Sequence, residues 1–476
     1  MSEIKQYIQT LLAQKNISVA KNRESIFEEF TKEEANIFAV NQIKDNQKMM
    51  LDKWVLKNRV SDIIDQQLII PNATVGKPYE VYIDYSKAGM DDLAYTSFDD
   101  LGQFGLEYNE QLGTIKGIPT KSGEFKISMK FRVNGENEDS ELNNKKVSLI
   151  INADPKSLWK NIPSDLDKDE IWKNVNYWKP DIDYDFKPLG DKHIVVASKR
   201  GRSHANVGSF RDDDFSFKHL EETGWSIVCV ADGAGSASLS RLGSKLACEF
   251  VISYFEENFN SDIVTELDSL IKNRDQSQDD VKQKNLDLFI YNNLGKAAFF
   301  VHKGLQDYAN KLERPLKDLH STLIFALFKK YDFGYAILSF GVGDCPIGLV
   351  NKDLTEIQLM NWLDVGEFGG GTRFITMPEI FSSNKFPTRF GFKVVEDFSY
   401  LMLMTDGIYD PKFVVEANLE KIECWSAFLE DLHGDNESNI KVELIAKNEN
   451  LPIQLSEWMD FWSSGNHDDR TLAIVF

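Results

Sequence analysis

The sequence is poor in the features that mark secreted, membrane-spanning or zinc-binding proteins. Its 476 residues include only four cysteines, and no two of them form a Cys-x-x-Cys pair, which disfavours a disulfide framework and a zinc site. No window approaches the roughly 20 apolar residues that cross a bilayer. The N-terminal stretch MSEIKQYIQTLLAQ mixes charges into its apolar positions, unlike a secretory signal. We therefore expect a soluble, cytoplasmic protein without a membrane partner.

Positive charge is also scarce. Lysine and arginine number 54 against 75 aspartates and glutamates, and the formal net charge is −21. Such an excess of carboxylates repels phosphate backbones, so we expect no nucleic-acid partner. The hydrophobic content of 42% with 12% aromatics is typical of globular proteins. The length is sufficient for roughly two to four domains.

The composition of the sequence and the spacing of its apolar residues change several times along the chain. The first part spaces its apolar residues as a helix does, and the second alternates apolar and polar residues between turn signals, as short strands do. A stretch rich in Trp, Pro, Asp and Lys follows, and strand and helix patterns then alternate to the end. We predict a helical N-terminal segment, a small all-β sandwich, a linker and a C-terminal domain, at residues 1–67, 68–153, 154–190 and 191–476.

The second part contains a motif of its own. Residues Leu112–Phe125, LGTIKGIPTKSGEF, resemble the immunoglobulin-like, cadherin-like modules of bacterial proteins. That resemblance implies a fold without catalytic chemistry. The role expected of such a module is to bind or space a partner, whose identity stays open.

In the C-terminal part, apolar strand-like runs repeatedly have an aspartate beside small residues at one of their ends. These aspartates are Asp232 in VADGAGS, Asp344 in GVGDC, Asp406 in MTDG and Asp468 in NHDDRT. Several such ends in one domain suggest a shared site. Carboxylates that converge repel one another unless a cation neutralises them, and oxygen ligands favour magnesium or manganese over zinc. Gly233 lets its backbone approach closely and could offer its carbonyl oxygen.

The order of these motifs resembles a known family. VADGAGSA, HSTLIFALF, SFGVGDCPIGLV, MTDGIYD and DDRTLAIVF, spread over residues 191–476, are similar to the metal-dependent type 2C (PPM) serine/threonine protein phosphatases, and most of all to their divergent bacterial branch. The resemblance implies an α+β fold, in which two antiparallel sheets flanked by helices form an α-β-β-α sandwich with a metal site at one end. The all-β immunoglobulin-like domain and the helical segment would precede it.

The resemblance also implies roles for single residues. Asp232 would bridge two Mn²⁺ or Mg²⁺ ions, and the carbonyl of Gly233 would bind one of them. Asp406 and Asp468 would be ligands of the other ion, and a third ion stays an open alternative. These three aspartates are the predicted catalytic residues.

A further metal ligand is expected in the motif RDDDF. Asp213 is favoured by its position before Phe215, while Asp212 and Asp214 stay open as alternatives. Asp469 stands where the family often has asparagine, which implies a supporting role. Asp344 is more consistent with a structural role than with direct metal binding.

The family holds the phosphate with an arginine just upstream of these acids. Here the stretch is SKRGRSHANVGSF, and the candidates are Arg200, Arg202 and His204. An arginine is the better physical match, because its planar guanidinium binds phosphate through two parallel hydrogen bonds.

The function implied is that of a hydrolase: a protein-serine/threonine phosphatase that cleaves phosphomonoesters with a water shared by two metal ions. Its substrate would be a phosphoprotein in a signalling system, opposite a serine/threonine kinase. The alternative is a catalytically inactive scaffold, but the retention of Asp232, Asp406 and Asp468 argues against it. Two other hydrolase signatures, Asp-x-Asp-x-Thr and Gly-x-Ser-x-Gly, are absent from the sequence.

Overall fold

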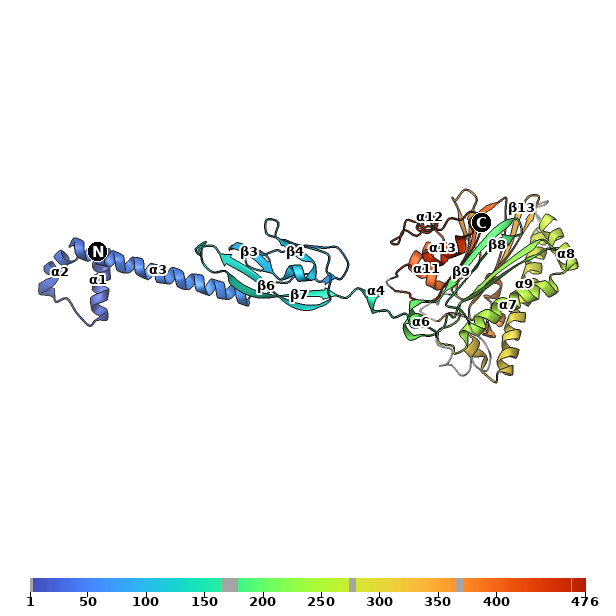
Figure 1. Ribbon diagram of the computed structural model, residues 1–476, viewed down its shortest axis with the longest axis horizontal. Helices are drawn as coiled ribbons and strands as arrows, with labels where there is room; N and C mark the ends of the chain where they lie inside the picture. Colours follow the sequence, from blue (N-terminus) through green and yellow to red (C-terminus); the bar gives the residue numbers. More distant parts are fainter. Residues whose placement is uncertain (1–2, 165–178, 274–279, 365–370, 464) are drawn as a thin grey trace. The chain divides into compact units, whose positions relative to one another are not determined.

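The computed structural model describes residues 3–476, apart from 165–178, 274–279, 365–370 and 464 (Figure 1). Its contacts divide the chain into two compact units, Met1–Leu158 and Trp159–Phe476, here called unit 1 and unit 2. Within the described residues, no helix is both long enough and apolar enough to cross a membrane.

Unit 1 begins with three helices, α1 (Glu3–Gln14), α2 (Glu24–Phe30) and α3 (Glu34–Asp65). Ile8 of α1 and Val40 of α3 are buried, and Lys44 of α3 lies 3.5 Å from Glu3. The far end of α3 belongs to the next layer, because Ile63 is fully buried in the core of the following sheets.

Two sheets complete unit 1. The first has the order β1-β7-β6-β3 and the second the order β2-β5-β4. Their strands are β1 (Ala73–Thr74), β2 (Tyr79–Tyr82), β3 (Leu93–Asp99), β4 (Leu106–Asn109), β5 (Thr114–Gly117), β6 (Gly123–Val133) and β7 (Asn143–Asn152). Ile127, Met129 and Phe131 of β6 are fully buried and share one core with Ile115 of β5. Because alternate residues of a strand face one side, the predicted alternation follows the pleat. The immunoglobulin-like assignment stays a prediction.

Unit 2 contains two larger sheets whose strand pairs are all antiparallel. One has the order β10-β11-β12-β13-β16 and the other β15-β14-β17-β18-β9-β8. The strands of the five-stranded sheet are β10 (Asp214–Leu220), β11 (Trp225–Ala231), β12 (Leu323–Tyr331), β13 (Gly334–Val342) and β16 (Phe390–Val395). Those of the six-stranded sheet are β8 (Ile182–Leu189), β9 (Lys192–Lys199), β14 (Ile347–Asn351), β15 (Ile357–Leu359), β17 (Phe398–Met404) and β18 (Arg470–Val475).

Helices cover the outer face of each sheet (Figure 1). The five-stranded sheet carries α7 (Ser240–Asn258), α8 (Ser261–Asn273) and α9 (Asp280–Lys311), and the six-stranded sheet carries α11 (Asp406–Phe413), α12 (Ile422–Leu432) and α13 (Leu451–Trp458). Shorter helices are α4 (Pro155–Leu158), α6 (Arg202–Val207) and α10 (Glu379–Ser382).

All seven residues of β11 are buried because the strand has a core on each side. Ile227 packs toward the helices, and Val228 packs toward the other sheet. This layering confirms the predicted α-β-β-α sandwich.

The predicted linker is too long at its C-terminal end. β8 pairs with β9 from Ile182 to Leu189, so these residues belong to the sandwich. Their alternating burial is weak, which explains why the sequence resembled a linker. Residues 165–178, with Trp172 and Trp178, lie outside the described residues.

Candidate metal centre

The first two acids of the site lie at neighbouring strand ends of the five-stranded sheet. Asp213 immediately precedes β10, and Asp232 immediately follows β11. The two strands are antiparallel, with Asp214 opposite Ala231. The start of one strand therefore lies beside the end of the other, and the two aspartates lie at the same end of this strand pair.

The six-stranded sheet brings its acids to the same place. Asp406 is the first residue of α11, directly after β17, and Asp468 lies just before β18. Asp213 joins the two sheets, because its Oδ2 atom accepts hydrogen bonds of 2.8 Å from the hydroxyls of Thr405 and Thr471. The sandwich therefore brings the predicted acids together at one end.

Close packing also depends on Gly407. A side chain at this position would overlap the backbone carbonyl of Asp469. The glycine after Asp406 thus lets α11 begin against the segment that carries Asp468.

The site is strongly unfavourable for negative charge. Burial raises the pKa of Asp232 well above its usual value, and further carboxylates raise it more: Asp213, Asp406, Asp468 and Asp344. Burial and the carboxylates of Asp468, Asp344 and Asp410 raise the pKa of Asp406 to about 8. Such a cluster requires either protons or a cation.

The donor atoms fit a hard divalent cation. Oδ1 of Asp406 is buried and has no hydrogen-bond partner within the described part of the chain, and an orphaned buried carboxylate oxygen is costly. Gly233 and Ser321 form an isolated antiparallel bridge. Its two hydrogen bonds are made by Asp232 and Ala234, the residues on either side of Gly233. Neither of these bonds uses the Gly233 carbonyl. All these donors are oxygens, which magnesium and manganese prefer.

The three acids of the RDDDF motif have different surroundings. Asp213 accepts hydrogen bonds from Thr405 and Thr471, and its charge raises the pKa of Asp232. Asp214 forms an ion pair of 2.9 Å with the buried Lys179. Oδ2 of Asp212 accepts a hydrogen bond of 3.0 Å from Ser240. Of the three acids, Asp213 is the one that raises the pKa of Asp232, and its role as a metal ligand stays a prediction.

Asp469 is buried and anchors backbone. Its carboxylate accepts hydrogen bonds from the backbone N–H groups of Gly201 and Asp212. It also pairs with Nδ1 of His204 at 2.9 Å. Burial alone would raise the pKa of Asp469, but His204 and these backbone bonds outweigh it and lower that pKa. This geometry suits a supporting role.

His204 lies at the edge of the cluster. One ligand atom each of His204, Asp468 and Asp469 lies within 4.8 Å of the others. Burial by itself lowers the pKa of this histidine, but Asp469, Asp212 and Asp468 outweigh it and raise the pKa to about 10. The neighbouring acids therefore favour the protonated form of His204.

The two arginines proposed to hold phosphate are engaged elsewhere. The guanidinium of Arg200 pairs with Asp181 at 3.1 Å, donates to Asn161 and Ser209, and is 4% exposed. Its burial in these contacts argues against the assignment of Arg200 to phosphate. Arg202 donates to the backbone carbonyls of Asp460 and Phe461. Of the three phosphate candidates, only His204 bonds to an acid of the cluster.

Asp344 follows β13 and accepts a hydrogen bond of 2.8 Å from Thr372. Burial raises its pKa, and Asp410 and Asp364 raise it further. The charge of Asp344 raises the pKa of Asp232 and of Asp406, and its own carboxylate accepts the hydrogen bond from Thr372.

Sequence reasoning missed several groups that support the acids. Lys179 is 2% exposed and donates to the carbonyl oxygen of Asp213 at 2.8 Å, yet it lies in the segment predicted to be a linker. Thr405 and Thr471 orient Asp213. Thr405 directly precedes Asp406, and Thr471 follows the DDR of residues 468–470. These positions beside the motifs could have identified both threonines from the sequence.

More than half of the sequence matches a known protein family. The family described as Protein phosphatase 2C matches residues 200–455, more than half of the chain. The chain belongs to the protein phosphatase 2C family. The match includes Asp213, Asp232 and Asp406 but ends before Asp468. No curated protein matches the sequence.

Several solved structures of phosphatases resemble the chain at low similarity. A bacterial serine phosphatase is 15% identical, with a TM-score of 0.32, and the match covers 59% of this chain and 96% of that one. RsbX in complex with magnesium is 12% identical, with a TM-score of 0.32 and coverages of 62% and 98%. The serine/threonine phosphatase Stp1 from Staphylococcus aureus is 13% identical, with a TM-score of 0.32 and coverages of 61% and 95%. Scores this low leave the family assignment to the sequence match.

Proposed function

We propose that this protein phosphatase 2C family member is an active, metal-dependent phosphoprotein phosphatase for phosphoserine or phosphothreonine. One observation carries the proposal. Carboxylates from both sheets converge in a buried cluster that is short of positive charge, and one oxygen of Asp406 lacks a partner within the described residues. A scaffold that had lost catalysis would have no reason to keep so costly an arrangement.

Asp213, Asp232, Asp406 and Asp468, with the carbonyl of Gly233, would hold two Mn²⁺ or Mg²⁺ ions. When bound, these ions would supply Lewis acidity, which stabilises charge on the phosphoryl oxygens and lowers the pKa of water. The number of ions is part of the proposal.

The protein's own groups position these ligands. The hydroxyls of Thr405 and Thr471 fix one carboxylate oxygen of Asp213, so we propose its other oxygen as the metal ligand. Asp469 ties the backbone of Gly201 and Asp212 to the start of β18. His204, held by Asp469, is the cation we propose for orienting the phosphate, because a charged imidazole donates from both nitrogens.

The test is hydrolysis of p-nitrophenyl phosphate by the full chain, with and without manganese or magnesium. We expect cation-dependent turnover, and its loss by at least about 100-fold in Asp232→Asn, because an amide cannot neutralise a cation. The matched control is Asp353→Asn, an exposed turn residue outside the cluster, which should retain wild-type turnover.

A second readout separates folding from function. Divalent cations should raise the melting temperature of the wild type and not that of Asp232→Asn. A folded wild type that neither binds a cation nor turns over substrate would contradict the proposal and favour the inactive scaffold.

For unit 1 we propose partner binding, without chemistry of its own. The supporting observation is an apolar row on α3, where Met50, Leu51, Trp54 and Val55 are 61–65% exposed. Such rows are typical of interaction surfaces. Light scattering of the wild type and of a Leu51→Lys/Trp54→Lys variant checks whether the partner is a second copy: a concentration-dependent mass that the variant lacks is the expected sign.

A further inference from the structure

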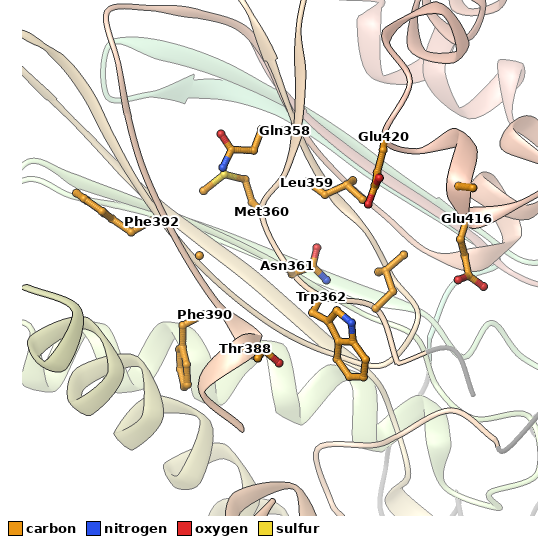
Figure 2. A pocket seen from close by; sticks show the side chains of 13 residues that line it. Gln358, Leu359, Met360, Asn361, Trp362, Thr388, Phe390, Phe392, Glu416 and Glu420 are labelled. Carbon is orange, nitrogen blue, oxygen red and sulfur yellow. The ribbon is translucent and has the colours of Figure 1, made fainter. Parts of the chain in front are cut away.

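Unit 2 has a pocket of about 730 Å³ that the metal centre does not use. It lies among β15, β16 and the turn of residues Glu416–Asn418 that follows α11. Its walls include Leu359, Trp362, Phe390, Phe392, Glu416 and Glu420. Figure 2 shows the two glutamates on one side of the pocket and the two phenylalanine rings on the other.

The pocket lies where both sheets end. β15 is the last strand of the six-stranded sheet, and β16 is the last strand of the five-stranded sheet. Edge strands have backbone groups that no neighbouring strand uses, and extended peptides bind to such edges. The place is therefore suited to an extended segment of another chain.

Hydrogen bonds connect the floor of the pocket to the loop that carries Asp344. Asn361 donates to the carbonyl of Cys345 at 2.9 Å and accepts from the N–H of Ile347 at 2.7 Å. On the other side of Asp344, the N–H of Asp364 donates to the carbonyl of Gly343 at 2.8 Å. The pocket floor and the Asp344 loop are thus neighbouring segments, and the carboxylate of that loop raises the pKa of Asp232.

The lining carries negative charge. Glu416 and Glu420 are exposed side chains, and among the described residues that line the pocket, 13 in number, there is no lysine or arginine. Partial burial raises the pKa of Glu416, and Asp410 and Asp344 raise it further. The negative charges of Asp410 and Asp344 therefore act on this wall.

Cations also lie close to the pocket. Lys421 directly follows Glu420 and donates to Oδ1 of Asn418 at 2.9 Å, while Arg389 and Lys385 lie near the ring of Trp362. Arg389 is neutralised by Asp364, to which it donates with both terminal nitrogens. Lys385 lies 4.9 Å from the centroid of the Trp362 ring. None of these three cations is among the residues that line the pocket, and Lys421 is held by Asn418.

We propose that this pocket binds a lysine or arginine side chain of the phosphoprotein substrate, on an extended segment adjacent to the phosphorylated residue. The cationic head pairs with Glu416 and Glu420, while the aliphatic stem lies along the apolar wall of Leu359, Phe390 and Phe392. The phosphate of the same segment then reaches the metal centre. This inference rests on the proposed function and specifies the class of its substrate.

The test uses phosphoserine peptides that carry one lysine, moved stepwise along the flanks, each paired with the same peptide in which that lysine is acetylated. Acetylation removes the charge and retains the stem. At the best position we expect kcat/KM about fivefold higher for the lysine peptide, the scale of exposed ion pairs. In the double variant Glu416→Gln/Glu420→Gln this ratio should fall to about one. Both peptides are measured in the same variant, so a general loss of activity cancels.

The matched control is Glu430→Gln, an exposed glutamate of α12 that does not line the pocket, which should keep the fivefold ratio. The charge reversal Glu420→Lys should instead favour a peptide with aspartate at the same position. A ratio near one at every position, with normal hydrolysis of p-nitrophenyl phosphate, would overturn the inference and leave the phosphatase function intact. A fivefold ratio that survives the double variant would also overturn it. No turnover of either substrate would remove the proposed function as well.

Discussion

Replacing Asp406 by asparagine should have opposite effects on stability without and with a divalent cation. Asp406 is buried in a cluster of acids, and burial together with Asp468, Asp344 and Asp410 raises its pKa to about 8. Without a cation, the ionised carboxyl destabilises the folded chain. Asparagine removes this charge at nearly constant volume, so Asp406→Asn should stabilise the metal-free protein.

The pH dependence follows from the direction of the shift. The folded-state pKa of Asp406 is above its ordinary value of 3.8, so the folded chain binds the proton more tightly than the unfolded chain. The destabilisation begins as the pH rises above 3.8 and is complete above about 8. At 1.36 kcal/mol per tenfold in proton affinity, the upper bound is about 6 kcal/mol. The neighbouring acids share the repulsion and water screens part of it, so we expect about 1–3 kcal/mol.

The assay is denaturant unfolding in EDTA across pH 5 to 9, for the wild type, Asp406→Asn and the exposed control Asp353→Asn. The advantage of Asp406→Asn should grow with pH, while the control should follow the wild type. In the presence of manganese the order should reverse, because binding at about 100 times Kd stabilises the wild type by about 2.7 kcal/mol and asparagine weakens the site.

Two results would refute this reasoning. One is a metal-free Asp406→Asn protein that is less stable than the wild type at pH 8.5. The other is an unchanged cation-dependent gain in stability in the variant. Either would mean that the carboxyl of Asp406 is satisfied by a contact other than a cation.

Two further predictions concern the buried ion pair of Lys179 and the core of unit 1. Lys179→Met should cost about 3–5 kcal/mol of unfolding free energy, because it leaves Asp214 buried without its ion pair; the exposed control Lys187→Met should cost less than about 1 kcal/mol. Ile63→Ala should cost about 2–5 kcal/mol, because Ile63 is fully buried in the core of unit 1. Its neighbour Ile64 is 43% exposed, and Ile64→Ala should have a small effect. Urea unfolding measures both pairs, and equal costs within either pair would contradict the burial assignments.

Much of the fold was predictable because local patterns and long-range packing agree. The alternation of Ile127, Met129 and Phe131 follows the pleat of β6, and the aspartates stand at the ends of apolar runs that are strands. The residues of β8 alternate only weakly between buried and exposed, so the sequence predicted a linker there. Its partner β9 determines that it is a strand, through register contacts that only the folded chain makes.

In the site, too, some residues were predictable from the sequence and others were not. The motifs were sufficient to nominate Asp232, Asp406 and Asp468. They could not distinguish Arg200, whose guanidinium is used by Asp181, Asn161 and Ser209, from an arginine available to phosphate. Lys179 was missed because its partners lie in other parts of the chain.

The sequence by itself determined the family, the layered fold class and the presence of a carboxylate-rich centre, because motif order and hydrophobic period are properties of the chain. Only the tertiary structure decided which contacts each of two neighbouring acids makes. Asp213 and Asp214 are adjacent in the sequence, but successive side chains of extended backbone point to opposite faces. One of them therefore faces the hydroxyls between the two sheets, and the other faces the buried Lys179.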